Sequence, residues 1–446
     1  MSISDRLEAM NFLNGLRLHG IHPTLENVRA LLDRTGNPQL RFSSIQVVGS
    51  NGKGSTASIL ASILAANDEG LVGLYTSPHL SDLRERVLVQ GQMLPVDSWL
   101  QVLDFTERSI RELGLPITFF EAITCAAFSL FERSGIQMAV LEAGMGGRWD
   151  ATSVAIPLAT VLTSVSLEHT QILGNTLVQI LAEKIAVGRE GRPFIAKLPD
   201  ELLPEFQRHA NTMGFIPILW GRDFSARWVS PETSLKRMFS YKGPSGTMEL
   251  PVSLVADYQI GNIALALASL DVLGKLPKEE TLAKALLQVV HPGRWEKISD
   301  SPQVYLDGAH NPEAAEVLAQ TIKDAFGPDQ KVIYLFGILE DKNWKQVLEH
   351  LVPSAESFFL TSPLSNRAVA PERLVQWLSS VNATLPKKSG PIEQVLGEAI
   401  ERAASLSLPL VVAGSLYLVG EVRQRLTGLI PDFPVGEHSP EDNRPS

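Results

Sequence analysis

The sequence predicts an α/β protein with two domains, each built on a parallel sheet covered by helices. The chain has 446 residues, more than one hydrophobic core usually holds, which indicates two domains. Short apolar runs alternate with amphipathic helical stretches over nearly the whole length, the pattern of parallel sheets. One apolar run also leads through a glycine-rich turn into a helix, as a phosphate-binding loop does.

The first series of elements spans residues 1–293 and predicts the larger domain, a P-loop-type parallel sheet. Its strand candidates are residues 44–48, 71–75, 138–142 and 158–163. The helical stretches between them include residues 55–66 and 176–187. Residues 224–251 break this rhythm: they are polar and strand-like around a turn at 242–246, and they predict a small β region appended to the first sheet.

A second series follows the segment His-Pro-Gly-Arg at positions 291–294, and predicts a smaller domain over residues 294–431. Its strand candidates are residues 303–306, 331–336, 357–360 and 408–413, and its helices include residues 312–325 and 371–381. Residues 432–446 are rich in proline and charge, which predicts a disordered tail. Ligands of such sheets lie beyond the carboxyl ends of the strands, so the loops there are the places to search for chemistry.

Composition narrows the classes of partner. The chain carries 39 basic and 49 acidic side chains, a net charge of −10, so it lacks the broad cationic surface that nucleic acids require. Cys125 is the only cysteine and lies in an apolar run, which predicts a buried structural residue and no disulfide or thiolate metal site. No apolar run reaches a membrane span and no secretory pattern opens the chain. We therefore expect a cytoplasmic protein.

The strongest local signal is Val-Gly-Ser-Asn-Gly-Lys-Gly-Ser-Thr at positions 48–56. Glycines let successive N–H groups turn inward, and the following helix adds a partial positive charge, so the segment predicts a phosphate site. Lys53 would approach the β- and γ-phosphates, and Ser55 or Thr56 would offer a hydroxyl to Mg²⁺. The candidate nucleotide contacts in the loop are Asn51, Gly52, Lys53, Gly54, Ser55 and Thr56.

The loop departs from the general P-loop pattern at two positions. Val47 stands where the first glycine is expected, and Gly54 follows the lysine where Ser or Thr is expected. A tight connection that binds nothing is the alternative interpretation. The lysine, the paired hydroxyls and the strand–helix context favour a nucleotide.

Other strand exits of the first series carry polar side chains. Glu142 ends a buried strand and opens the run Glu-Ala-Gly-Met-Gly-Gly-Arg, which predicts a magnesium ligand followed by a loop that approaches its ligand closely. In that loop Arg148 and Asp150 could orient a substrate. Ser77 follows the strand at 71–75, and Glu168 and His169 follow the strand at 158–163.

Each of these residues also has an ordinary structural interpretation. Glu142 could cap a helix, and His169 could be a buried structural histidine. Lys184, on the predicted helix 176–187, would by default have a solvated side chain. Several polar strand exits in one sheet nevertheless favour a shared site.

Several separated motifs resemble those of one known family. They lie at residues 49–56, 77–80, 85–86, 142–152, 169–170, 183–184, 262, 292–294, 307–312 and 414–417. With these motifs the chain resembles the folylpolyglutamate synthase/dihydrofolate synthase family of the Mur ligase superfamily, over nearly its whole length. The resemblance implies a central ATP-binding domain and a smaller Rossmann-like C-terminal domain. It also implies an ATP-dependent carbon–nitrogen ligase of folate biosynthesis that acts as a monomer.

The resemblance also implies roles for individual residues. Ser55, Ser77, Glu142 and His169 match magnesium ligands, and Lys184 matches a lysine that is carbamylated to support a second Mg²⁺. Asn262, Arg294 and Asp307 match nucleotide contacts, with His310 beside them. Positions that match the pterin and benzoate region are Thr24, Phe119, Phe120 and Glu121, with Arg148 as a further substrate candidate. The catalytic candidates are Lys53, His169, Lys184, Arg294 and His310.

In the implied reaction ATP phosphorylates a pterin or folate carboxylate, and the amine of L-glutamate attacks the acyl phosphate. The substrates would be ATP, L-glutamate and dihydropteroate or a reduced folate. This sequence departs from the family at a few positions: Glu168 replaces Asp, Asp82 and Arg84 replace Arg and Asn, Ala256 and Tyr258 replace Gly and His, and Asn343 replaces Asp. We expect activity to survive because the catalytic candidates are intact.

Three other functions stay open at this point. A Mur-type ligase could act on a cell-wall nucleotide precursor, although too few residues precede the phosphate loop for a separate nucleotide-sugar domain. A P-loop ATPase switch would hydrolyse ATP without an amino-acid site. A degenerate binding protein would have lost catalysis through the substitutions above.

Overall fold

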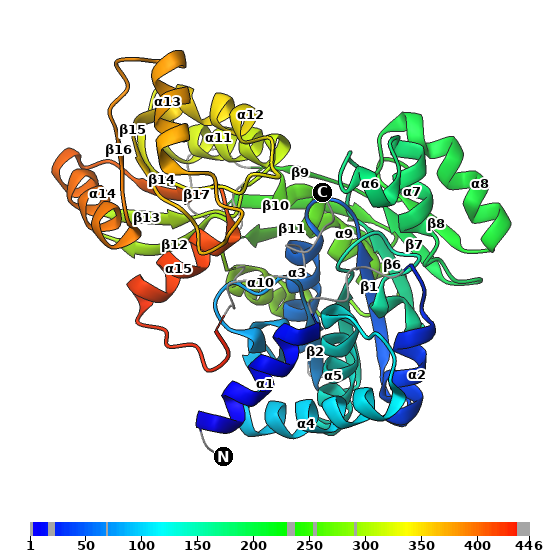
Figure 1. The fold of residues 1–446 in the computed structure, drawn as a ribbon. Coiled ribbons are helices and arrows are strands. Elements are labelled where there is room, and N and C mark those ends of the chain that lie inside the picture. The colour runs from blue at the N-terminus through cyan, green and yellow to red at the C-terminus, as the bar shows by residue number, and fades with distance from the viewer. Residues whose placement is uncertain are drawn as a thin grey trace. The chain divides into compact units, whose positions relative to one another are not determined.

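The computed structural model of the protein describes residues 3–16, 23–67, 70–229, 237–252, 257–289 and 292–434 (Figure 1). The chain divides into two compact units. The described residues up to His79 and from Arg84 to Val289 form unit 1, and Leu80–Leu83 and the described residues from Pro292 form unit 2. None of the helices in the described ranges is long and apolar enough to cross a membrane.

Unit 1 contains an eight-stranded sheet in the order β4-β3-β2-β5-β1-β6-β7-β8. The strands are β1 (Ser43–Val48), β2 (Val72–Tyr75), β3 (Val87–Val89), β4 (Gln92–Met93), β5 (Met138–Glu142), β6 (Ala159–Leu162), β7 (Pro193–Ala196) and β8 (Ile216–Leu219). The six strands from β2 to β8 pair in parallel, and β3 and β4 add an antiparallel edge. The predicted parallel sheet is therefore confirmed, and β1, which leads to the glycine-rich loop, lies between β5 and β6.

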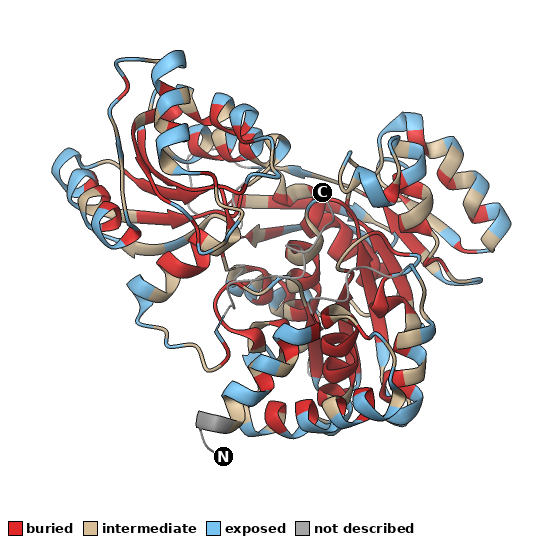
Figure 2. Ribbon diagram, viewed as in Figure 1, coloured by how far each residue is buried: buried red, intermediate tan, exposed pale blue. Residues whose placement is uncertain are grey.

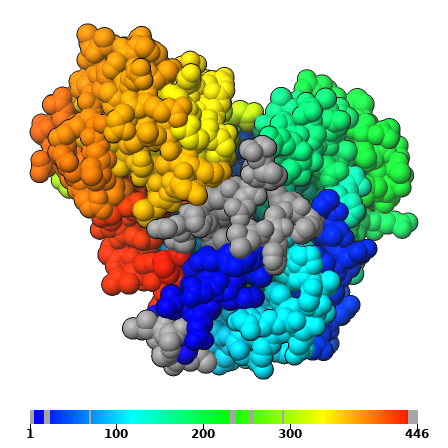
Figure 3. All heavy atoms as spheres, viewed as in Figure 1, coloured from blue at the N-terminus to red at the C-terminus, as the bar shows by residue number. Residues whose placement is uncertain are grey.

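Helices cover both faces of this sheet. They are α1 (Ile3–Leu16), α2 (Glu26–Arg34), α3 (Lys53–Ala66), α4 (Val96–Leu113), α5 (Phe119–Arg133), α6 (Thr170–Leu173), α7 (Leu177–Ile185), α8 (Leu203–Met213), α9 (Gln259–Val272) and α10 (Glu279–Gln288). Apolar residues of α3, α9 and α10 share one core with the strands. The central strands are almost wholly buried, whereas the edge strand β4 and the outer faces of the helices are exposed (Figure 2). Helices α1 and α4 form part of the surface of unit 1 (Figure 3).

The predicted small β region is a three-stranded antiparallel sheet in the order β11-β10-β9. Its strands are β9 (Ser225–Trp228), β10 (Arg237–Gly243) and β11 (Gly246–Val252), and β10 and β11 form the predicted hairpin. Residues 230–236 within the predicted region lie outside the described residues. Side chains of this sheet join the core around α9, so the β region supports that helix.

Unit 2 is a six-stranded sheet in the order β12-β13-β17-β14-β15-β16, parallel except for β12. Its strands are β12 (Glu296–Asp300), β13 (Gln303–Leu306), β14 (Val332–Phe336), β15 (Ala355–Leu360), β16 (Lys387–Ser389) and β17 (Leu410–Ala413). Its helices are α11 (Pro312–Phe326), α12 (Trp344–Leu351), α13 (Pro371–Val381), α14 (Ile392–Leu406) and α15 (Leu416–Thr427). The first three pack into one core and the last two into another, on opposite faces of the sheet, which is the expected Rossmann-like arrangement.

Two features of the chain's division differ from the prediction. The segment Leu80–Leu83 belongs to unit 2 although it lies far from the predicted boundary at residue 293. Residues 432–434 were predicted to be disordered, which is wrong, because Phe433 is fully buried. A single apolar side chain in a polar, proline-rich stretch gives no periodic signal, so its burial could not be read from the sequence. Residues 435–446 lie outside the described residues.

Candidate active site

The glycine-rich loop joins β1 to α3, as predicted. Gly49 and Gly52 have φ of 149° and 84°, which L side chains rarely adopt, so glycine is required at both positions. A Cβ on Gly52 would collide with Oδ1 of Asn262, and Thr56 Oγ1 lies 3.4 Å from the same oxygen. The fold thus places Asn262, at the start of α9, against a loop that is about two hundred residues away in the sequence.

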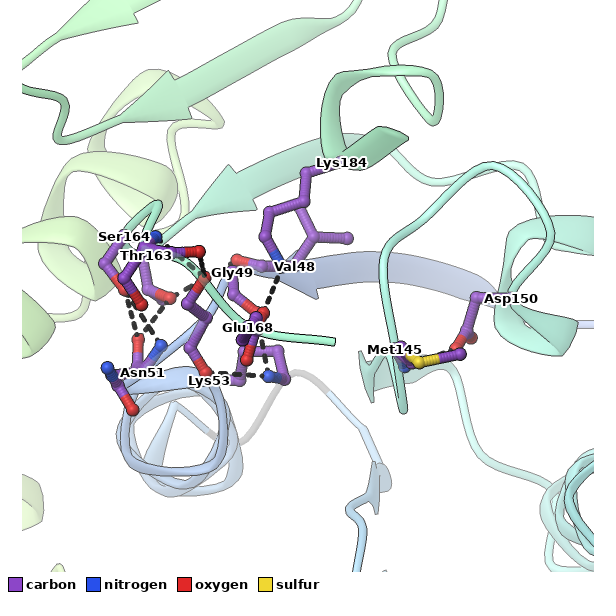
Figure 4. Close-up of polar contacts among 12 residues, drawn as sticks. Val48, Gly49, Asn51, Lys53, Met145, Asp150, Thr163, Ser164, Glu168 and Lys184 are labelled. Carbon is purple, nitrogen blue, oxygen red and sulfur yellow. Dashed lines mark hydrogen bonds and ion pairs between the residues drawn. The ribbon is translucent and has the colours of Figure 1, made fainter. Parts of the chain in front are cut away.

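Lys53 lies over this loop. Its Nζ donates hydrogen bonds to the carbonyl oxygens of Gly49 and Ser50 at 2.8 and 3.0 Å (Figure 4). The ammonium is therefore held at the concave side of the loop, where the first turn of α3 also points its N–H groups. An ammonium group and main-chain N–H groups on the same side of a loop form a site that can bind an anion.

Hydroxyl groups at the end of β6 brace the loop from the other side. Thr163 Oγ1 donates to the carbonyl of Asn51 at 2.6 Å, and the Asn51 N–H donates to Ser164 Oγ at 2.9 Å. The Ser166 N–H donates to Ser50 Oγ at 3.0 Å. Thr163 and Ser164 were not among the predicted site residues, although hydroxyls at the exit of a strand next to β1 were a usable signal.

Lys184 is fully buried, contrary to the default of a solvated side chain. Its Nζ donates to Glu168 Oε1 at 2.7 Å, and burial lowers the pKa of Lys184 to about 8 (Figure 4). Burial opposes ionisation of Glu168, but the positive charges of Lys53 and Lys184 lower its pKa overall. The structure therefore links Lys184 electrostatically to the phosphate loop. Helical periodicity could not show this, because the burial depends on how α7 packs.

Glu142 and Ser77 lie together at the ends of neighbouring strands. Glu142 is the last residue of β5 and is buried, and its Oε2 accepts the N–H of Ser77 at 3.0 Å. His169 directly follows Glu168 at the start of α6 and has φ of 45°. In the described ranges, no group of three or more His, Cys, Asp and Glu side chains could hold a metal ion by itself.

The expected donors instead combine two hydroxyls, one carboxylate and one imidazole: Ser55, Ser77, Glu142 and His169. Mg²⁺ prefers oxygen ligands and usually keeps several waters, so a sparse set of this kind fits it. The buried carboxylate of Glu142 supplies the negative charge that such a site needs.

Asp150 supports the glycine-rich turn after β5. It is buried, and its carboxylate accepts the N–H groups of Met145 and Thr152, both at 3.0 Å, and the Thr152 hydroxyl at 2.6 Å. Burial raises the pKa of Asp150. Arg148 in the same turn donates from Nε to Glu183 Oε1 at 2.9 Å, which ties the turn to α7 beside Lys184.

The predicted substrate residues on α5 differ in burial and in the groups that they contact. Glu121 caps its own helix: Thr118 N–H donates to Glu121 Oε2 at 2.8 Å, and Glu121 N–H donates to Thr118 Oγ1 at 3.2 Å. Phe119 is buried beneath the Arg86 guanidinium, 5.5 Å from its ring centroid. Phe120 is half-buried between Tyr75 and Gly144, so it adjoins the turn after β5.

Thr24 lies apart from this group in the sequence, before α2. Its hydroxyl accepts the N–H of Glu26 at 3.1 Å, a local turn contact. Among the departures from the family, Ala256 lies outside the described residues.

The remaining predicted residues belong to unit 2. Asp307 is buried at the end of β13, and its two carboxylate oxygens accept the N–H groups of Trp295 and Ala309, both at 2.9 Å. Burial raises the pKa of Asp307, and the charge of Arg294 opposes that rise. His310 Nδ1 lies 2.7 Å from the carbonyl of Gly308, which fixes the ring orientation. Arg294, Asp307 and His310 thus form one cluster within unit 2.

Comparison with known families matches both units. The Mur ligase middle domain matches residues 47–270, and the dihydrofolate synthetase C-terminal domain matches residues 295–426. The probable bifunctional folylpolyglutamate synthase/dihydropteroate synthase of Halobacterium salinarum is 35% identical over 94% of this chain, and the chain spans about half (51%) of that protein's length.

Two further relatives match along nearly their whole length. The folylpolyglutamate synthase of Lacticaseibacillus casei is 32% identical over 90% of this chain and 94% of its own. The structure of Escherichia coli FolC in complex with DHPP and ADP superposes with a TM-score of 0.83 at 29% identity, over 95% of this chain and 98% of that one. These matches show that the chain belongs to the folylpolyglutamate synthase/dihydrofolate synthase family of the Mur ligases.

Proposed function

We propose that the protein is an ATP-dependent ligase that forms an amide bond between a pterin or folate carboxylate and L-glutamate. It would act as a dihydrofolate synthase, a folylpolyglutamate synthase or both. The observation that carries the proposal is the phosphate loop with Lys53 above it and the ion pair of the buried Lys184 with the partly buried Glu168 beside it. The chain is similar over nearly its whole length to proteins with these names. We place the ligase in the cytoplasm, as a monomer.

The nucleotide would bind the phosphate loop and its neighbours. The proposed contacts are Asn51, Gly52, Lys53, Gly54, Ser55, Thr56, Asn262, Arg294 and Asp307. Support comes from the two left-handed glycines and from Asn262, which lies against Gly52. We assign residues 1–293 to the ATP-binding central domain and 294–431 to the C-terminal ligase domain.

Mg²⁺ would be held by Ser55, Ser77, Glu142 and His169. Bound there, it would offset negative charge on the phosphates during transfer. We further propose that Lys184 is carbamylated and supports a second ion. Its amine would form a bond to the carbon of CO₂ and lose a proton, which replaces a buried cation by a carboxylate. The complete burial of Lys184 supports this assignment, because a buried ammonium is costly.

The pterin substrate would contact Thr24, Phe119, Phe120, Glu121 and Arg148. Phe120 is the best placed of these, because its ring is half-buried beside Gly144, in the turn that follows Glu142. Glu121 would act through the helix cap that it forms, so it orients the first turn of α5.

The chemistry follows from charge. A substrate carboxylate oxygen attacks the γ-phosphorus of ATP and ADP leaves, so an acyl phosphate forms. The glutamate amine then attacks the acyl carbon, and phosphate leaves as the amide forms. Lys53 and Arg294 would stabilise charge on the transferred phosphoryl group, while His169, Lys184 and His310 would orient the reacting groups.

The test is a product analysis with the full chain, Mg²⁺-ATP, L-glutamate and either dihydropteroate or a reduced folate. The expected result is a pterin product that is heavier by one glutamyl residue, together with equimolar ADP and phosphate. ATP hydrolysis at the same rate without pterin or glutamate, and with no adduct, would instead favour the ATPase switch.

A further inference from the structure

The segment Leu80–Leu83 lies between two parts of unit 1 but packs within unit 2. Ser81 Oγ donates to the carbonyl of Gly420 at 3.3 Å, and Gln424 Nε2 donates to the carbonyl of Ser81 at 3.3 Å. A Cβ on Gly420 would overlap the Leu80 carbonyl. The segment therefore lies directly on the backbone of α15, at the one turn where that helix has no side chain in the way.

The chain after α15, coloured red in Figure 1, closes over the same segment. Asp82 is 1% exposed, and its Oδ2 accepts the N–H of Asp432 at 2.7 Å and that of Phe433 at 3.4 Å. The Leu83 N–H donates to the carbonyl of Phe433 at 3.0 Å, and Asp82 and Pro434 pair in an isolated antiparallel β-bridge. Phe433 is fully buried. A buried carboxylate that accepts two main-chain N–H groups is a strong and directional anchor.

This anchor depends on the residue type at position 82. A side chain that only donates hydrogen bonds could not accept the N–H groups of Asp432 and Phe433, so the anchor needs an acceptor oxygen at position 82.

Both flanks of the segment carry candidate site residues. Three residues before Leu80, Ser77 donates its N–H to Glu142. Three residues after Leu83, Arg86 donates from Nε to His79 Nδ1 at 2.7 Å and covers Phe119. Only four residues separate Asp82 from Ser77 and three separate it from Arg86, so the anchor limits how far either residue can move.

We propose that Asp82 and the segment Asp432–Pro434 form a clasp that positions the loop 77–86 for catalysis. The proposal rests on the ligase function proposed above. Asp82 and Phe433 are positioning residues, and they act through Ser77, His79 and Arg86. Residues 432–434 thereby help to position the loop that carries these candidate site residues.

A matched pair of truncations tests the clasp. Removal of residues 435–446 should leave the KM for folate unchanged, while removal of residues 432–446 should raise it about tenfold, the effect of losing roughly one charge-assisted hydrogen bond. A merely structural role would reduce the active fraction, and so kcat, at an unchanged KM. Equal KM values for the two truncations would overturn the proposal.

Point variants keep the test decisive if the longer truncation unfolds. Asp82→Ala removes the acceptor and should raise the KM for folate, whereas Asp82→Asn retains one acceptor oxygen and should restore most of the wild-type value. The same KM in D82A and in the wild type would refute the clasp.

Hydrogen exchange separates the clasp from the ligase function. Peptides that cover residues 76–86 should exchange faster in D82A and in the 432–446 deletion than in the 435–446 deletion. If the wild-type chain makes no glutamate adduct, the proposed function fails, and exchange alone judges the clasp. Unchanged exchange in D82A would then reject it.

Discussion

Gly52→Ala tests whether the phosphate loop is shaped by its contact with Asn262. Gly52 has φ of 84°, and a Cβ there would collide with Asn262 Oδ1. The Asn262 amide cannot easily move, because its Nδ2 donates to Gln259 Oε1 at 2.8 Å and the residue is buried. The chain offers a matched control in Gly36, which has φ of 80° and nothing within 4 Å of a Cβ.

Both substitutions place alanine in a left-handed backbone conformation, but only Gly52→Ala also makes a steric overlap. Alanine in the left-handed region costs about 1–2 kcal/mol, so Gly36→Ala should lower the free energy of unfolding by that amount and leave ATP binding alone. Gly52→Ala adds an overlap that forces either the loop or Asn262 to shift. A shift of about 1 Å in a phosphate site typically costs two orders of magnitude in activity, so we expect the KM for ATP to rise at least about tenfold.

Denaturant unfolding and the KM for ATP should be measured for both variants and for Gly52→Ala combined with Asn262→Ala. The double variant removes the obstacle and should recover part of the stability lost in Gly52→Ala. If Gly52→Ala binds ATP with wild-type affinity, or if Gly36→Ala loses as much affinity, the contact with Asn262 does not shape the loop.

Three further predictions concern the contacts of Lys184 and Gly420. Lys184→Met should abolish glutamate ligation and leave the partly buried Glu168 without its cation. Addition of Glu168→Gln should then restore stability but no activity, as thermal unfolding and product analysis would show. Folding lowers the pKa of the unmodified Lys184 amine from 10.5 to about 8, so the unfolded chain binds more protons between these values. Without carbamylation, the wild type should therefore gain stability relative to Lys184→Met as pH rises through this window, which unfolding at stepped pH in CO₂-free buffer would check. Gly420→Ala should destabilise the protein because its Cβ meets the carbonyl of Leu80, whereas Gly397→Ala, in α14 with nothing within 4 Å, should stabilise it by about 1 kcal/mol; equal effects in denaturant unfolding would contradict this reasoning.

One departure from the family is compatible with the structure. Glu168 is one methylene longer than the usual Asp, yet its carboxylate reaches Lys184 Nζ at 2.7 Å. The ion pair that buries Lys184 therefore does not require the family's usual residue.

Features that depend on short-range residue patterns could be predicted from the sequence. Alternation of apolar runs and helical stretches predicted both parallel sheets, since side-chain periodicity repeats over a few residues. The spacing of glycines around Lys53 predicted the phosphate loop. The polar residues after β5 and β6 indicated the edge of the sheet formed by the carboxyl ends of its strands. The strands β3, β4, β7 and β8 were not among the predicted strands. β3 and β4 have only three and two residues, and β7 and β8 each contain a proline, which argues against a strand.

The tertiary structure was needed to show which side chains are buried and which residues they contact. The sequence could not show that Lys184 is enclosed, that Asp150 holds a turn, or that Asn262 lies against Gly52. It also gave no sign that Phe433 covers the segment at Asp82, in a stretch that composition assigns to a disordered tail. Burial and long-range contact depend on how distant elements pack, and the type of a single residue does not identify the distant residue that it contacts.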